Sequence, residues 1–191
     1  TRYIGDWSSD VCSSDLAGDF ITVEDLLNEV NKDAIRFMML NRSNDAELDF
    51  DFEKVKEKTK ENPVYYVQYA YARINSITRT LKKKLSDKIL IENKSFNPNE
   101  YEKKILRKIF EWPKIIESAS YKLEPHKIPF YLYELSTLFH SYWSKGNEDK
   151  NYRFLENDKV KRLETLAFIY LTAIVIKNGM NILGVSLPEK M

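Results

Sequence analysis

Apolar residues recur at three- and four-residue steps along most of the chain, which is the period of amphipathic α-helices. The clearest series follows Asn62-Pro63, because Asn caps a helix well and Pro fits its first turn, where no backbone N–H is needed. This series predicts a helix from residue 62 to about residue 84. Its buried stripe is predicted to consist of Val64, Val67, Tyr71, Ile74, Thr78 and Leu81.

Helix start and stop signals divide the rest of the chain into further helices. Thr22, with Asp25 three positions on, favours a first short helix, and apolar positions between residues 34 and 40 favour a second. Later helices are predicted to begin near Pro98, near Pro113, around Lys127 and around Asp158, the last ending at Asn178-Gly179. We therefore predict an all-α fold.

The composition agrees with a soluble helical domain. Of the 191 residues, 43% are hydrophobic and 31% charged, and the 5 Gly and 6 Pro are too few for many tight turns. The formal net charge is only +1, so any binding to nucleic acid must come from local contacts rather than from a long-range field.

Cysteine usage and hydropathy bear on the compartment. Cys12 is the only cysteine, which excludes an internal disulfide and a multi-cysteine zinc motif and fits a reducing cytoplasm. The longest apolar run, residues 166–176, is interrupted by Thr172 and is far shorter than the roughly 20 residues of a membrane span. We expect a cytoplasmic protein that does not enter a membrane.

Residues 1–16 differ from everything that follows. They contain a near-repeat rich in Ser and Asp and show neither a helical nor a strand period. The string resembles the translation of a sequencing-library adapter, and we interpret it as a non-native, adapter-derived segment. The alternative is a Ser/Asp-rich loop that caps the next helix.

Candidate metal ligands are sparse. His126 and His140 have no partner at a metal-ligand spacing, so we predict structural roles for both. The acidic stretch at residues 45–51 lacks the spacing and the central glycine of a calcium-binding EF-hand loop and is predicted to be a solvated turn. We predict no metal site.

The predicted helix after Asn62 carries a second face. A helical period places Tyr66, Tyr69 and Arg73 within roughly 60° of one another, turned away from the apolar stripe. Flat rings and a planar cation are the groups that bind an unstacked single-stranded loop, where stacking contributes roughly 1–3 kcal/mol per base. On the residues alone, an ordinary amphipathic boundary is the alternative, and both interpretations stay open.

Short blocks in a fixed order resemble one family. They are Ala17-Gly18-Asp19-Phe20, Asp33-Ala34-Ile35-Arg36, Asn62 to Arg73, Glu124-Pro125-His126-Lys127, Phe139 to Trp143, and Asn178 to Met191. The chain resembles the arginyl-tRNA synthetases (class I) from about Ala17 to its last residue. Tyr71 stands where the family more usually has histidine.

The resemblance implies a fold and a domain organisation. Residues 62–191 are expected to form a helical bundle of the class I aminoacyl-tRNA synthetase anticodon-binding (DALR) type. Residues 17–61 are expected to be a remnant of the region that links the catalytic and anticodon-binding domains. The chain would then be the carboxy-terminal part of a longer enzyme.

The resemblance also implies a binding site for the anticodon loop of tRNA-Arg. It is expected to comprise Tyr66, Gln68, Tyr69, Arg73, Phe139, Trp143 and Met191. Phe139 lacks the hydroxyl of the tyrosine usual in relatives, so it could stack but not donate a hydrogen bond. By spacing alone, Phe139 and Trp143 lie on one helix face and are typical of a core pair.

The parent enzyme, by the same resemblance, would be an arginine–tRNA ligase that uses ATP with Mg. This chain carries neither a His-Ile-Gly-His-type motif nor a Lys-Met-Ser-Lys-Arg loop, so we predict no catalytic residue, no bound cofactor and no ligase activity of its own. Arginine and ATP would bind only to the missing catalytic domain. We expect a monomer that binds tRNA-Arg.

Two alternative interpretations remain, of which the first belongs to a different functional class. One is an all-helical protein-interaction or scaffold domain without RNA binding, with its aromatic residues in the core. The other is the matching domain of another class I synthetase, against which the block from Gly184 to Met191 argues. Exposure of Tyr66, Tyr69, Arg73 and Trp143 at one surface would favour RNA binding, whereas burial of all four would favour the scaffold.

Overall fold

The computed structural model describes residues 23–44, 46, 59, 61–81, 97–153, 155–156, 159–160 and 163–191. The interpretation of residues 1–16 as non-native falls on residues outside these ranges, as does most of the acidic stretch at residues 45–51. The predicted division between residues 61 and 62 stays a prediction.

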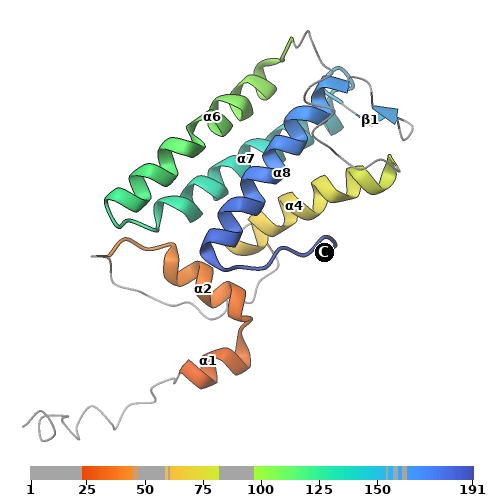
Figure 1. The fold of residues 1–191 in the computed structure, drawn as a ribbon. Coiled ribbons are helices and arrows are strands. Elements are labelled where there is room, and N and C mark those ends of the chain that lie inside the picture. The colour runs from red at the N-terminus through yellow and green to blue at the C-terminus, as the bar shows by residue number, and fades with distance from the viewer. Residues whose placement is uncertain are drawn as a thin grey trace, which may run out of the picture.

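The described elements are helices with one small hairpin. The helices are α1 (Val23–Glu29), α2 (Lys32–Leu40), α4 (Pro63–Thr80), α6 (Glu100–Tyr121), α7 (Lys127–Glu148) and α8 (Leu163–Leu183). Strands β1 (Leu155–Glu156) and β2 (Lys159–Val160) pair antiparallel between α7 and α8. The four long helices lie alongside one another, and α2 packs against α4 and α8 at one end of the bundle (Figure 1). The predicted all-α fold is confirmed.

Local signals explain where the long helices α4 and α6 begin. Asn62 caps α4, with Pro63 at its first position as predicted. Asn99 and Glu102 form a capping box at the start of α6, in which Asn99 Oδ1 accepts from Glu102 N at 3.0 Å and Glu102 Oε2 accepts from Asn99 N at 2.8 Å. The buried Glu102 also accepts from Tyr142 Oη at 3.0 Å and Thr165 Oγ1 at 3.1 Å, which ties α6 to α7 and α8.

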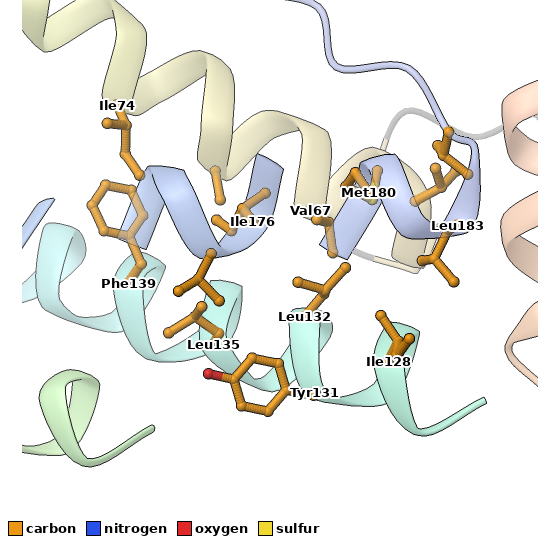
Figure 2. Packing of buried hydrophobic residues seen from close by; sticks show 14 of the residues in the cluster. Val67, Ile74, Ile128, Tyr131, Leu132, Leu135, Phe139, Ile176, Met180 and Leu183 are labelled. Atoms are coloured by element: carbon orange, nitrogen blue, oxygen red, sulfur yellow. The ribbon is translucent and has the colours of Figure 1, made fainter. Parts of the chain in front are cut away.

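The core lies where α4, α7 and α8 face one another. Figure 2 shows apolar side chains of α7 reaching towards those of α4 and α8. Fully buried members are Val67, Ile74, Leu132, Leu135, Phe139, Ile176 and Met180. A layer of interdigitated side chains of this kind fixes the relative position of α4 and α7, which matters because the candidate site is built on these two helices.

The apolar part of α8 is longer than the run of residues 166–176 noted in the sequence. Residues Thr165–Leu183 are long and apolar enough to cross a membrane by length and composition alone. The central helix of a bundle passes the same test, and 56% of this stretch is buried inside the structure. Its packing against α4, α6 and α7 accounts for its composition.

Two predicted boundaries are wrong for the same physical reason. Pro113 does not begin a helix but lies inside α6, whose packing against α7 and α8 offsets the backbone hydrogen bond that proline removes. Gly179 does not end α8; a Cβ there would lie 2.7 Å from Leu132 Cδ2, so glycine serves the close approach of two helices. The helix ends instead at Gly184, which has a left-handed φ of 67°.

The buried stripe of α4 is also wider than predicted. Ala70, Ala72 and Ile77 are buried in addition to Val64, Val67 and Ile74. The predicted stripe members Tyr71, Thr78 and Leu81 are only half-buried. Small alanines were not counted as core positions, yet they let α7 and α8 approach α4 from two sides.

Candidate nucleic-acid interface

Aromatic side chains of α4 and α7 meet at one edge of the bundle. Tyr66 packs on Tyr133 and His140 with ring centroids 5.2 and 4.5 Å apart, and Tyr69 lies 5.6 Å from His140. We call this group the α4–α7 cluster; it consists of Tyr66, Tyr69, Arg73, Tyr133, His140 and Trp143. Helical spacing selects its members, because residues three, four and seven apart share one face.

Arg73 lies between two rings of the cluster. Its Cζ is 4.5 Å from the centroid of the Tyr69 ring and 4.8 Å from that of Trp143, and Nη2 donates a hydrogen bond to Tyr69 Oη. Each such cation–π contact contributes roughly 0.5–2 kcal/mol and holds the guanidinium in place. Guanidinium has five N–H donors, so a fixed planar cation with donors to spare is presented beside the rings.

The four residues whose exposure was to separate RNA binding from a scaffold are all half-buried. Tyr66, Tyr69, Arg73 and Trp143 lie at one surface, and none belongs to the fully buried core. Part of each side chain is therefore fixed by packing while another part meets solvent. This is the arrangement that a preformed stacking surface requires.

His140 supports the two tyrosines from the bundle side. It is buried, and its Nε2 lies 3.3 Å from the carbonyl oxygen of Tyr66. Burial first, and the nearby Arg73 to a smaller extent, lower the pKa of His140 from its ordinary 6.5 to about 4, although the hydrogen bond with the Tyr66 carbonyl raises it. The imidazole is thus neutral near pH 7 and contributes a ring rather than a charge.

Phe139 differs from the expectation that it stacks on a base. Its side chain is fully buried, with its ring centroid 6.4 Å from that of Trp143 and 5.8 Å from that of His140. The ring packs behind the cluster and offers no face to a ligand. The spacing interpretation, a core pair, fits Phe139, whereas Trp143 is only half-buried.

Gln68 and Met191 lie at a neighbouring cleft rather than in the cluster. The cleft has a volume of about 640 Å³ and is lined by Glu29, Val30, Asn31, Asp33, Ala34, Asn62, Val64, Tyr65, Gln68, Ser186, Leu187, Pro188 and Met191. Gln68 Nε2 donates to the carbonyl oxygen of Ser186 at 2.9 Å, and Met191 is 50% exposed. The predicted site residues therefore form two adjacent groups.

Tyr65 joins the cleft to the cluster and was missed by the sequence analysis, as was Tyr133. The Tyr65 ring stacks on the Tyr69 ring, with the two centroids 6.0 Å apart and an interplanar angle of 7°. Tyr65 also lines the cleft. Its spacing of four from Tyr69 was the signal available. Tyr133 lies two turns before His140 on α7, a periodicity that would have pointed to it.

Among the residues that the structure describes, no three His, Cys, Asp or Glu side chains come close enough together to hold an ion.

Comparison with known proteins places this arrangement in a family. The model of the DALR anticodon binding domain matches residues 67–191. An arginine–tRNA ligase of Pelagibacter ubique is 56% identical over 174 residues, which covers 91% of this chain and 30% of that protein. An arginine–tRNA ligase of Brucella ovis is 42% identical over 181 residues, which covers 92% of this chain and 31% of that protein. The chain thus spans about a third of the length of these relatives.

Solved structures agree. A Campylobacter jejuni chain described as an arginyl-tRNA synthetase has a TM-score of 0.78 at 27% identity, over 92% of this chain and 37% of its own. The Thermus thermophilus arginyl-tRNA synthetase, at 22% identity, shares the fold with a TM-score of 0.61. The match covers 91% of this chain and 28% of that chain. With a family model matched over well more than half of its length and the same all-helical fold, the chain belongs to the DALR anticodon-binding domain family.

Proposed function

We propose that this chain is the tRNA anticodon-binding part of an arginine–tRNA ligase and that it binds the anticodon loop of tRNA-Arg. The observation that carries the proposal is Arg73, held between the rings of Tyr69 and Trp143 at a half-exposed surface. Unstacked bases of a loop need flat rings to stack on and donors at their edges, and this surface has both.

The residues would divide the work of binding. Tyr66, Tyr69 and Trp143 stack on bases, and Arg73 donates to a base edge or a phosphate. Gln68 and Met191 shape the neighbouring cleft, where the loop continues. Phe139 does not contact the RNA; it packs against Trp143 from the core and holds that ring in place.

The rest of the reaction belongs to the whole protein. We infer that it activates arginine with ATP and Mg and transfers it to tRNA-Arg in the cytoplasm. The bound anticodon stem-loop would place the distant acceptor end correctly. For this chain alone we expect binding as a monomer and no ligation.

Binding to two tRNAs tests the proposal. The affinity of the chain is measured for tRNA-Arg and for the same tRNA with a swapped anticodon, at one moderate salt concentration. The wild type should prefer the arginine anticodon, and Tyr69→Ala and Arg73→Ala should each lose roughly tenfold or more, because each removes a contact of roughly 1–3 kcal/mol.

Matched controls lie on α6, away from the cluster. Arg107→Ala removes the same charge from an exposed position, and Tyr121→Ala removes a tyrosine that is 89% exposed. Both should bind as the wild type does. Equal or absent binding to both tRNAs would contradict the proposal and favour a protein-interaction domain.

A further inference from the structure

The end of α8 is held by α2 through the backbone. Arg36 Nε donates to the carbonyl oxygen of Leu183, directly before the left-handed Gly184. The turn is completed by Val185 N, which donates to the carbonyl oxygen of Met180 at 3.0 Å. Arg36 leaves no room beside this turn, since a Cβ at residue 184 would lie 2.8 Å from Arg36 Nε.

Asp33 binds the chain at Ser186, two residues after Gly184. Its Oδ2 accepts a hydrogen bond from Ser186 Oγ. Asp33 and Arg36 are three residues apart on α2, so they lie on one face of the helix. Ala34, Ile35 and Phe37 of the same helix are buried, which fixes α2 against the bundle and gives the two polar side chains a rigid base.

Side chains of α4 bind the backbone carbonyl groups of the same tail, residues 184–191. Gln68 Nε2 donates to the carbonyl oxygen of Ser186 at 2.9 Å, and Arg79 Nη1 donates to that of Glu189 at 2.8 Å. Figure 1 shows the tail turning back from the end of α8 and running beside α4. The tail forms one wall of the 640 Å³ cleft, through Ser186, Leu187, Pro188 and Met191.

We propose that Asp33 and Arg36 are positioning residues of the RNA-binding surface, which act by fixing the tail against α4. A terminal segment of eight residues is ordered only where it is tied down, and these two side chains tie it at its root. They lie outside the residues 67–191 that match the family model. The inference rests on the proposed function, because the tail matters through the cleft that it walls.

Hydrogen exchange tests the tie without RNA. In the full chain, Arg36→Ala and Ser186→Ala should speed exchange of the Gly184 and Val185 amides, which donate to the carbonyl oxygens of Asn181 and Met180, roughly tenfold. A hydrogen bond to a charged group contributes on the order of a factor of ten or more. Exchange in the middle of α8 should not change. Lys32→Ala, which removes the same charge as Arg36→Ala from an exposed position of α2, is the control and should leave the tail protected.

Affinity for tRNA-Arg tests the consequence. Asp33→Ala, Arg36→Ala and Ser186→Ala should each weaken binding several-fold, up to about tenfold. Asp33→Asn keeps an oxygen that accepts from Ser186 and should bind as the wild type. The double variant Asp33→Ala/Ser186→Ala should bind tRNA-Arg no more weakly than either single variant, because each substitution removes the same hydrogen bond between Asp33 and Ser186.

The outcomes separate the two proposals. A tail that stays protected in Arg36→Ala overturns the inference, as does a loosened tail with unchanged affinity when Tyr69→Ala loses binding. A wild-type chain that binds no tRNA would overturn the proposed function and the RNA part of the inference together. Additive losses in the double variant would show that Asp33 acts through something other than the tail, which also overturns it.

Discussion

Replacing His140 should remove most of the acid sensitivity of the fold between pH 6.5 and pH 4. His140 is buried beneath Tyr66 and Tyr69, with Arg73 as the nearest cation, and burial lowers its pKa from 6.5 to about 4. In the unfolded chain the imidazole regains its ordinary pKa. The unfolded chain therefore binds a proton in a pH range where the folded chain does not.

The sign and size follow from linkage. Well above pH 6.5 neither state is protonated and the stabilisation is complete. As the pH falls through 6.5 towards 4, the unfolded state gains the proton while the folded state stays mostly neutral, so the free energy of unfolding falls. A difference of one pH unit in pKa corresponds to about 1.4 kcal/mol, so the full loss is about 3 kcal/mol and the loss at about pH 5 is about 2 kcal/mol.

Urea unfolding at about pH 7.5, 6 and 5 measures this loss. The wild type should lose about 2 kcal/mol over the series, and His140→Gln, which cannot be protonated, should lose much less. Equal pH dependence in the wild type and His140→Gln would refute the reasoning, because it would mean that the buried ring titrates normally or that the cluster opens before it is protonated.

Further stability predictions concern the supports of the site. Glu102→Ala should lower the free energy of unfolding by about 2–4 kcal/mol in urea titration, because the hydroxyls of Tyr142 and Thr165 lose a buried acceptor and Asn99 N loses its partner in the capping box. The exposed Glu100→Ala should leave the midpoint unchanged. Phe139→Ala should cost about 3–5 kcal/mol by the same assay, as truncation of a fully buried aromatic does. A small loss for Phe139→Ala would indicate that the ring lies at the surface after all.

The parts of the fold that could be predicted depend on neighbours in the chain. The start of α4 at Pro63 follows from a cap and a proline, which act within one turn. Pro113 and Gly179 were misinterpreted because their local signal, a break, is overruled by partners far away: α7 and α8 for Pro113, and Leu132 for Gly179. A propensity is worth about 1–3 kcal/mol, which packing of a long helix readily exceeds.

The candidate site was predictable to the extent that it lies on one helix. Tyr66, Tyr69 and Arg73 share a face by periodicity, and the structure brings them together. On α7, spacing alone favoured the core for Phe139, where the structure places it, and the site role came only from the family resemblance. The seven-residue spacing of Tyr133 from His140 was a usable signal, but periodicity alone does not show which face of α7 meets α4. Nor could it show that Gln68 turns towards the tail, since that contact joins residues 118 positions apart.

The geometry of Arg73 also decides between classes of partner. Its charge is half-buried between two rings, so a partner that covers it must supply hydrogen-bond acceptors or leave a desolvated cation unpaired, which is costly. An apolar peptide would cover the rings but supply no acceptor for the donors of the cation beyond the one that binds Tyr69 Oη. A small anion would pair with the cation but leave the rings uncovered. An unstacked base offers a flat face to the rings and acceptors at its edge, so it satisfies both at once. With a formal net charge of only +1, the protein has no strong field to attract RNA from a distance, and selectivity must come from this local fit.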